Sequence, residues 1–404
     1  METTTDAVFL TGATGFIGME LLVRYLERTE RRIYALVRGL SDRDAELRME
    51  RTLLGLFGPD HRYAGRVIAV RGDLTHSGMG IGGGTDQLTE QVSEIVHSAA
   101  STSFELDLQS ARAINVDGTR RVLDFAERCH TRGGLRRLSH ISTAYVAGDA
   151  SGCFSEDDLD VKQGFQNTYE RSKFEAESHV ARTRSHLPIT IFRPSIVVGE
   201  RVSGWTPTFN VLYWPLRAFS RGNYPVLPAR RDSPADVVPV DYVADAIFAL
   251  SQTRETEGST FHLSAGAHAS RVGDVVELAA AFFKRSQPRI IDPSLYHRTM
   301  HPLLLRVAGD ERFRRELARS EVYFPYLAMR ASFDDRRCRV ALRNTDVQTT
   351  PLPSYFNRLL RFAVAAQWGR RQISRARANG YMRPPPFTRV AQRSHSTSSL
   401  VPVE

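Results

Sequence analysis

A tyrosine and a lysine four residues apart are the side chains of this sequence best suited to acid–base chemistry. Tyr169 and Lys173 lie in the string Tyr-Glu-Arg-Ser-Lys, and in a helix this spacing puts both on one face, about one turn apart. An isolated phenol has a pKa of about 10, so a nearby ammonium group that lowers this pKa would make Tyr169 an efficient proton donor at neutral pH. The pair therefore predicts protonation of a carbonyl oxygen.

A hydroxyl at the end of a predicted strand completes this constellation. Residues 142–145 read Ser-Thr-Ala-Tyr and lie at the end of a strand predicted to begin at Leu138. We expect Thr143 to hold the carbonyl oxygen to which Tyr169 donates its proton. Ser142 is the alternative, because adjacent residues of a strand face opposite sides of a sheet.

A glycine-rich segment near the start of the chain predicts a dinucleotide site. Residues 11–18 read Thr-Gly-Ala-Thr-Gly-Phe-Ile-Gly and follow a short apolar run. Among Gly12, Gly15 and Gly18, one allows a tight turn, another lets the backbone reach a pyrophosphate, and the last lets the helix pack close to the strand. A bound nicotinamide beside a proton donor is the equipment for hydride transfer, so the chain is predicted to be an oxidoreductase.

The elements that must position these residues follow from an alternation of apolar runs and helical patterns. Strands are predicted at 7–10, 32–37, 67–70, 95–97, 138–144, 189–198, 237–240 and 261–263, and helices through Arg28, at 113–129, around Tyr169 and at 213–219. This alternation favours an α/β fold with a Rossmann-like doubly wound parallel sheet. Asp241 is expected to be the N-cap of the helix that follows it.

Four regions are expected along the chain. Residues 1–199 would form the NADP-binding domain, and 200–270 a substrate-binding lid interleaved with the last elements of the sheet. Residues 271–380 would form a mostly helical region that includes a basic amphipathic stretch from Pro351 to about Ala378. The Pro-, Ser- and Thr-rich end, 381–404, is expected to be a disordered tail.

The end of the second predicted strand favours NADPH over NADH. An acidic residue there would bind the ribose 2′-hydroxyl of NAD, but the strand closes with Arg38, whose planar fork of donors suits a 2′-phosphate. Asp73 follows another strand and could contact the adenine amine. Ala99 and Ala100 end a further strand, where small residues let a cofactor pass closely.

Several motifs together resemble those of the extended short-chain dehydrogenase/reductases over about residues 6–265. Within that superfamily the chain is most similar to fatty acyl-CoA reductases and to the thioester reductase domains of carboxylic acid reductases. The motifs are the segments 11–18, 72–74, 97–104, 115–119, 141–145 and 193–197, the pair Tyr169 and Lys173, and the dipeptide Gly204-Trp205.

The resemblance implies a catalytic trio, a cofactor site and a reaction. The trio would be Thr143, Tyr169 and Lys173. The NADPH site would be lined by Thr11, Gly12, Thr14, Gly15, Phe16, Ile17, Gly18, Arg38, Asp73, Leu74, Ala99, Ala100, Lys173, Pro194 and Ile196. The expected reaction is the reduction of an acyl-CoA or acyl carrier protein thioester to a fatty aldehyde or alcohol. The region after about Arg271 is shorter than in the eukaryotic alcohol-forming enzymes, so the product stays open between the two.

Other functions on the same fold are alternatives. Nucleotide-sugar epimerases and dehydratases and hydroxysteroid dehydrogenases share the cofactor loop and the trio. The aromatic segment Trp205, Phe209, Tyr213, Trp214 and Phe219 suits an apolar acyl chain better than a sugar diphosphate. A non-catalytic NADP-binding regulator is the minor alternative, and the presence of both Tyr169 and Lys173 argues against it.

Charge and composition restrict the partners. The formal net charge of +9 calls for anions, which the phosphates of a cofactor or of coenzyme A, or an acidic carrier protein, would supply; nucleic acid is not expected. The basic helical stretch from Leu359 to Arg377 makes peripheral membrane contact an alternative. Three widely spaced cysteines predict no disulfide and no metal site, and with no signal peptide or membrane span expected, the predicted location is cytoplasmic.

Overall fold

Seven parallel strands form the centre of the computed structural model, which describes residues 6–380 except 210, 223–225, 297 and 299–320. The strand order is β12-β7-β5-β4-β1-β2-β3, and every neighbouring pair is parallel. The strands are β1 (Ala7–Thr11), β2 (Ile33–Val37), β3 (Val67–Arg71), β4 (Val92–His97), β5 (Arg137–Ile141), β7 (Ile189–Pro194) and β12 (Thr260–Leu263). The order reverses between β1 and β4, and the carboxyl ends of strands at such a point form a ligand crevice. The predicted doubly wound α/β fold is confirmed.

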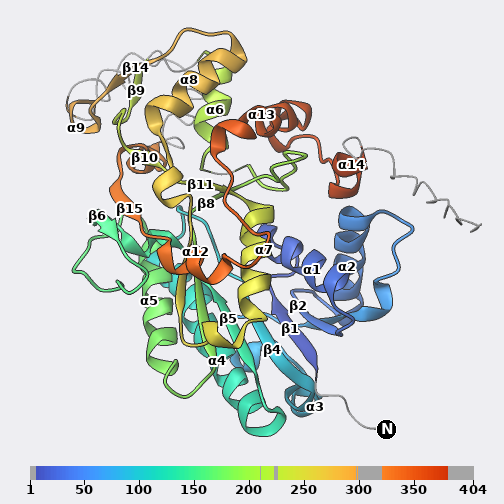
Figure 1. The fold of residues 1–404 in the computed structure, drawn as a ribbon. Helices are drawn as coiled ribbons and strands as arrows, with labels where there is room; N and C mark the ends of the chain where they lie inside the picture. Colours follow the sequence, from blue (N-terminus) through green and yellow to red (C-terminus); the bar gives the residue numbers. More distant parts are fainter. Residues whose placement is uncertain (1–5, 210, 223–225, 297, 299–320, 381–404) are drawn as a thin grey trace, which may run out of the picture.

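Helices cover both faces of this sheet (Figure 1). On one face α1 (Phe16–Arg28) packs against α7 (Val240–Ser251) and α2 (Asp42–Phe57), and on the other α4 (Leu108–Gly133) packs against α5 (Thr168–Thr183) and α3 (Thr85–Gln91). Helix α5 is the predicted helix that carries Tyr169 and Lys173. Its N-cap is Asn167, whose side chain accepts a hydrogen bond from the Glu170 N–H at 3.0 Å.

A second layer, which we call the cap, stands over the carboxyl ends of the strands (Figure 1). Its helices are α6 (Tyr213–Ser220), α8 (Val272–Phe283), α9 (Pro293–Leu295) and α13 (Phe356–Ala365). Helix α12 (Arg336–Leu342) lies against β12, and α14 (Arg375–Gly380) packs on α2. Short strand pairs connect them: β8 (Ile196–Val198) with β11 (Val237–Pro239), β9 (Val226–Pro228) with β14 (Arg289–Ile291), β10 (Pro234–Ala235) with β13 (Ser270–Arg271), and β6 (Ser151–Phe154) with β15 (Arg330–Phe333). Side chains of α6, α8 and α13 share one apolar core.

Some predicted boundaries were wrong. The run 189–198 is two strands, β7 and β8, in different sheets, because Pro194 has no N–H to continue the ladder and the chain turns at Ser195. The strand predicted to extend through 144 ends at Ile141. Helix α7 begins at Val240 with Pro239 as its N-cap, so Asp241 lies inside the first turn, where its carboxylate accepts from the Arg201 N–H at 3.1 Å. The C-terminal region also contains β14 and β15 besides helices.

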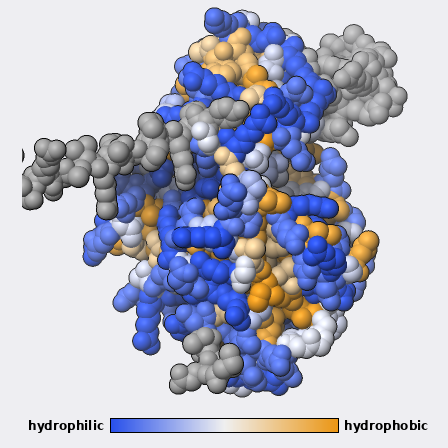
Figure 2. All heavy atoms as spheres, turned by 90° about the vertical axis from the view of Figure 1, so that its right-hand side faces the viewer, coloured by the Kyte–Doolittle hydropathy of each residue, from blue (hydrophilic) through white to orange (hydrophobic). Residues whose placement is uncertain are grey.

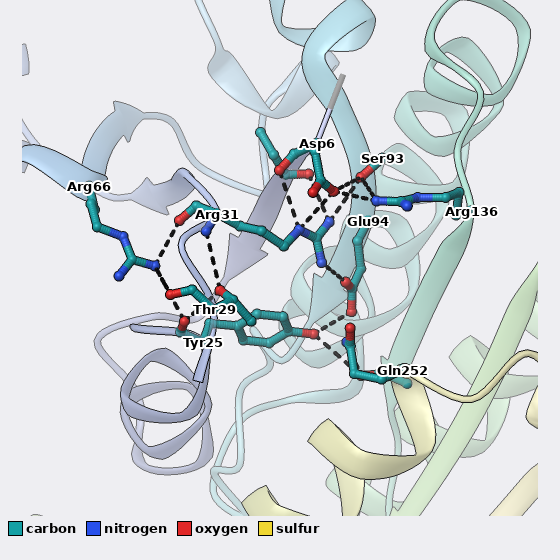
Figure 3. A network of polar contacts seen from close by, with 11 residues as sticks. Asp6, Tyr25, Thr29, Arg31, Arg66, Ser93, Glu94, Arg136 and Gln252 are labelled. Carbon is teal, nitrogen blue, oxygen red and sulfur yellow. Dashed lines mark hydrogen bonds and ion pairs between the residues drawn. The ribbon is translucent and has the colours of Figure 1, made fainter. Parts of the chain in front are cut away.

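A polar network fixes the base of the first β–α–β unit, at the end of the sheet away from the glycine loop (Figure 3). The Arg66 guanidinium donates to the main-chain oxygens of Leu26, at 3.0 Å, and of Thr29, and so satisfies carbonyls that the end of α1 leaves open. The Glu94 carboxylate on β4 accepts from the hydroxyl of Tyr25 and from the guanidinium of Arg31. These contacts hold the C-terminal end of α1, whose other end begins at the glycine loop.

The basic helical stretch near the end of the chain packs into the cap. In α13, Leu359, Leu360 and Phe362 are buried, although Val364 is 49% exposed. Its apolar side is therefore covered by protein, which removes the basis for the predicted membrane contact. On the side of the molecule shown in Figure 2, hydrophilic residues cover most of the visible surface and hydrophobic residues lie in separate patches. Within the described residues, no helix is both long and apolar enough to cross a membrane; the predicted tail, 381–404, lies outside them.

Candidate active site

The glycine loop leaves no room for side chains at two of its positions. Gly12 has a φ of +77°, and a Cβ there would lie 2.7 Å from the backbone nitrogen of Ala99. A Cβ on Gly18 would lie 2.0 Å from the carbonyl oxygen of Gly12. Helix α1 therefore begins in direct backbone contact with the loop, as the sequence predicted for the last glycine.

The start of α1 has the character of an anion site. Its N-cap is Gly15, and no side chain among the described residues caps the first N–H groups of the helix. Open N–H groups at a helix start, beside a backbone cradle that a Cβ would fill, fit the pyrophosphate of a dinucleotide.

Thr11 supports this loop from below rather than facing the crevice. Its hydroxyl is fully buried, lies 2.8 Å from Nδ1 of His97 and accepts from the Ala99 N–H at 3.2 Å. Nε2 of His97 lies 3.0 Å from the hydroxyl of Thr119 on α4. Burial lowers the pKa of His97 to about 3, so the ring is neutral and ties β1, β4 and α4 together. The sequence analysis gave no role to His97 or Thr119.

The residues predicted for the adenosine half of the cofactor lie beyond β2 and β3. Arg38 is exposed just after β2. Burial opposes ionisation of Asp73, but hydrogen bonds from Thr75 and the nearby charge of Arg38 hold the pKa of its carboxyl below the usual value. Leu74 is buried, and its side chain packs against Gly118 of α4, so it faces the core.

A cleft of about 1460 Å³ brings most of the other predicted residues together. It lies at the carboxyl ends of β1, β4, β5 and β7, under the cap. Predicted site residues among its lining are Gly15, Phe16, Ile17, Ala100, Thr143, Tyr169, Pro194 and Ile196. Gly12, Thr14 and Ala99 belong to the loops beside it, Gly18 lies in the first turn of α1, and Lys173 is buried next to it.

Thr143 and Tyr169, two residues of the predicted catalytic trio, both line this cleft. Burial raises the pKa of Tyr169 to about 12, a hydrogen bond with the Thr143 hydroxyl opposes this rise, and the charge of Glu170 adds to it. The phenol is therefore protonated at neutral pH, although this raised pKa makes it a weaker acid than an ordinary phenol. The groups that shift the pKa of Tyr169 do not include Lys173, so the expected lowering of this pKa by Lys173 is not seen in the chain by itself.

Lys173 is held by the backbone of β5. Its ammonium group donates to the carbonyl oxygen of Ile141 at 2.8 Å. Burial lowers the pKa of Lys173 to about 8, and the nearby Glu177 carboxylate opposes this shift. Most of the lysine is therefore charged at neutral pH, although it is buried.

Ser142 and Thr143 differ in what their hydroxyls contact. The Ser142 hydroxyl donates to Glu177, which also accepts from the Arg193 guanidinium at 2.6 and 2.9 Å. Ser142 borders the cleft as well, but its hydroxyl is engaged in this buried ion pair. The arrangement favours Thr143 as the residue that holds a carbonyl oxygen.

Asn115 is a buried residue of the site to which the sequence analysis assigned no role. On α4, its side-chain amide donates to the Ser101 carbonyl at 3.0 Å and to the Ser172 hydroxyl at 2.9 Å, and its oxygen accepts from the Ser101 N–H at 2.8 Å. It thus joins the loop after β4 to the turn of α5 between Tyr169 and Lys173. Its place in the motif at 115–119 was the signal in the sequence that could have revealed it.

An apolar cavity lies in the cap beside the cleft, and about 70 Å³ of it is open to a water-sized sphere. Four residues line both spaces: Ile196, Val211, Tyr323 and Tyr326. The rest of the cavity lining is Leu212, Pro215, Leu216, Phe219, Leu227, Ala235, Val237, Val272, Val275, Val276, Ala279, Pro288 and Leu327. The cleft and the apolar cavity therefore adjoin at these four residues.

The aromatic segment predicted to hold an acyl chain is mostly core. Trp205 and Tyr213 are buried, and the Tyr213 hydroxyl accepts from the Gly199 N–H at 3.0 Å. Phe209 packs on Tyr213, and Trp214 faces the Arg217 guanidinium. Of the five aromatic residues, Phe219 is the one that lines the cavity. Trp205 packs in the core beneath the cap and Tyr213 in the core of the cap, and Phe209 and Trp214 do not line the cavity either.

Comparisons with known proteins agree with this geometry. Residues 10–247 match the model of the family described as Male sterility protein. The chain is 31% identical over 284 residues to fatty acyl-CoA reductase wat of Drosophila melanogaster, covering 60% of this chain and 53% of that protein. It is 24% identical over 446 residues to probable fatty acyl-CoA reductase 5 of Arabidopsis thaliana, covering 83% and 89%. The chain thus spans about half the length of the Drosophila relative.

A solved structure extends the likeness through the cap. The terminal R domain from the myxalamid PKS-NRPS biosynthetic pathway is 28% identical, with a TM-score of 0.78, and the match covers 91% of this chain and 93% of that domain. The match therefore includes both the parallel sheet and the cap region.

Proposed function

The chain belongs to the Male sterility protein family, and from this membership and the geometry of the cleft we propose that it reduces fatty acyl thioesters with NADPH. One observation carries the proposal: the glycine loop, Thr143 and Tyr169 border a single cleft that adjoins an apolar cavity in the cap. The apolar lining of this cavity suits an acyl chain whose thioester carbonyl lies at Tyr169. The similarity to fatty acyl-CoA reductases and to an R domain supports the same reaction class.

The residues present fit a dinucleotide. Gly12, Gly15 and Gly18 would hold its pyrophosphate at the start of α1, Arg38 would face a 2′-phosphate, and Lys173 would bind the nicotinamide ribose. Bound NADPH would supply a hydride to the substrate carbon.

The chain's own groups handle the oxygen and its proton. Thr143 and Tyr169 would hold the thioester carbonyl oxygen, and Tyr169 would transfer its phenolic proton to that oxygen as negative charge develops on it. The resulting hemithioacetal would lose its thiol as the carbon–sulfur bond breaks and the hydroxyl proton passes to sulfur. One acyl thioester, one NADPH and one proton give one aldehyde, one thiol and one NADP⁺; a second round would give the alcohol.

The test is NADPH consumption by the purified protein with saturated acyl-CoA esters from medium to long chain. We expect oxidation that depends on chain length, with aldehyde or alcohol identified by gas chromatography. Nucleotide sugars serve as the rival substrates. Turnover of a nucleotide sugar, with acyl-CoA inert, would replace the proposal with an epimerase or dehydratase function.

Replacing Arg38 by alanine tests the cofactor preference. Because a charge-assisted hydrogen bond contributes about 1.5–3 kcal/mol, we expect the Kd for NADPH to rise at least about tenfold while the Kd for NADH changes less than about twofold. The measurement is quenching of protein fluorescence on titration with each cofactor. Arg43→Ala is the control, since Arg43 is an exposed α2 residue that pairs with Glu46. An equal loss for both cofactors would move Arg38 away from the 2′-phosphate.

Replacing Ala279 by phenylalanine tests whether the cavity holds the acyl chain. Ala279 is buried on α8 and lines the cavity, so a ring there would shorten the space. We expect kcat/KM for the longest accepted acyl-CoA to fall at least about tenfold, since several buried methylenes at about 0.8 kcal/mol each would lose their place. Medium-chain esters should change little. Ala281→Phe, at an exposed position on the same helix, should keep the wild-type dependence of kcat/KM on acyl chain length. If both variants keep that dependence, the acyl chain binds outside this cavity.

A further inference from the structure

Tyr326 joins the cap to the helix that carries Tyr169. It belongs to a short 3₁₀ turn, Phe324–Ala328, far along the chain from α5. Its hydroxyl donates to the Glu170 carboxylate at 2.7 Å and accepts from the Asn167 side-chain amide at 2.8 Å. Asn167 and Glu170 flank the catalytic tyrosine in the first turn of α5.

The hydrogen bonds of Tyr326 and Glu170 are buried. Tyr326 is 5% exposed and Glu170 is 1% exposed. The second oxygen of the Glu170 carboxylate accepts from the Gln166 N–H at 2.8 Å. A buried carboxylate depends on its hydrogen-bond donors, so the Tyr326 hydroxyl helps to fix the turn in which Tyr169 sits.

The ring of Tyr326 is fixed as firmly as its hydroxyl. It stacks on Phe104 with ring centroids 5.5 Å apart and meets the edge of Tyr145 at 5.0 Å. Phe104 in turn contacts the ring of Tyr169 at 5.7 Å. Tyr326 therefore touches the surroundings of the catalytic phenol from two directions, through Glu170 and through Phe104.

The same ring stands where the apolar cavity meets the cleft, since Tyr326 lines both. An acyl chain that extends from the cavity to a thioester at Tyr169 would cross the boundary that Tyr326 forms with Ile196, Val211 and Tyr323. We propose that Tyr326 is a positioning and specificity-determining residue: its hydroxyl orients the first turn of α5 and its ring forms the passage for the acyl chain. This inference rests on the proposed acyl thioester reductase function.

Tyr326→Phe removes the hydroxyl and keeps the ring. We expect kcat for acyl-CoA to fall about tenfold through poorer placement of Tyr169, with KM for acyl-CoA and Kd for NADPH within about twofold of wild type. A loss of general stability would instead lower the amount of folded protein and leave kcat per active site unchanged. Tyr34→Phe is the matched control, because it removes a hydroxyl that donates to Gln91, away from the cleft. Wild-type kcat in Tyr326→Phe would overturn the positioning role.

Tyr326→Ala removes the ring and tests the passage. We expect the dependence of KM on acyl chain length to flatten, while Tyr326→Phe keeps the wild-type dependence. A wild-type dependence in Tyr326→Ala would overturn the passage.

A binding measurement separates failure of this inference from failure of the proposed function. If wild-type protein does not oxidise NADPH with any acyl-CoA, the proposed reaction fails, but the passage is still tested with cis-parinaric acid, a fluorescent fatty acid. We expect wild type to bind this probe and Tyr326→Ala to change its Kd at least about fivefold, as expected for an altered apolar contact. Absence of binding, or equal Kd values, would overturn the passage.

Discussion

Replacing Tyr169 by phenylalanine is expected to lower kcat for acyl thioester reduction at least about a thousandfold, because a positioned general acid contributes about 10²–10⁴ in rate. The phenol is protonated, its pKa is raised to about 12 by burial, and it borders the cleft beside Thr143. Phenylalanine keeps the ring contact with Phe104 and removes the transferable proton. The Kd for NADPH should stay within about twofold, since the cofactor loop is untouched.

To compare Tyr169→Phe with wild type, kcat and the Kd for NADPH are measured on the same preparation of each protein. Steady-state NADPH oxidation with a long-chain acyl-CoA gives kcat, and fluorescence titration gives the cofactor Kd. A variant that keeps more than about a tenth of the wild-type kcat would assign the proton to another donor. Loss of cofactor binding in step with kcat would point to a disturbed loop instead.

Among substitutions that add one methyl group in the cofactor region, Gly18→Ala is expected to lower stability and NADPH affinity the most. The added Cβ would lie 2.0 Å from the Gly12 carbonyl oxygen and 2.6 Å from its carbon, and backbone atoms cannot turn aside as a flexible side chain does. Helix α1 and the loop must separate, so we expect a stability loss of about 1–3 kcal/mol or more and a rise of about a hundredfold in the Kd for NADPH.

Gly55→Ala is a control in which the added methyl group is expected to raise stability instead of lowering it. Gly55 lies inside α2, and a Cβ there meets nothing within 4 Å. Alanine should therefore stabilise the protein by about 0.5–1 kcal/mol, through helix propensity alone, and leave the Kd for NADPH unchanged. Thermal unfolding and cofactor titration of both variants check the pair. Unchanged cofactor affinity in Gly18→Ala would show that the loop does not carry the pyrophosphate.

The sequence was most informative where chemistry and structure are both local. The glycine loop needs three glycines beside one strand, and the Tyr169–Lys173 pair needs one turn of helix, so the spacing alone predicted their positions. Asn115 and Tyr326 could not be found in this way. Their partners, Ser172 and Glu170, come from other elements, and a buried hydrogen bond between distant segments leaves no periodic signal.

The cap was harder to predict for a related reason. Aromatic residues between 205 and 219 look the same in a sequence whether they fill a core or line a cavity. Which of the two occurs depends on α8 and α13, which cover them from later in the chain. Only the arrangement of these helices distinguishes Phe219, at the cavity, from Tyr213, in the core.

The strand pairs of the cap have a consequence for how specificity in such proteins can be re-engineered. β10 pairs with β13, β9 with β14, and β6 with β15, so segments before and after the last strand of the sheet are paired with one another. No single stretch of sequence contains the apolar cavity, and exchanging one stretch between relatives would leave unmatched strand edges. Chimeras that exchange the cap therefore need to exchange the segments around 151–154, 196–239, 264–295 and 321–369 together.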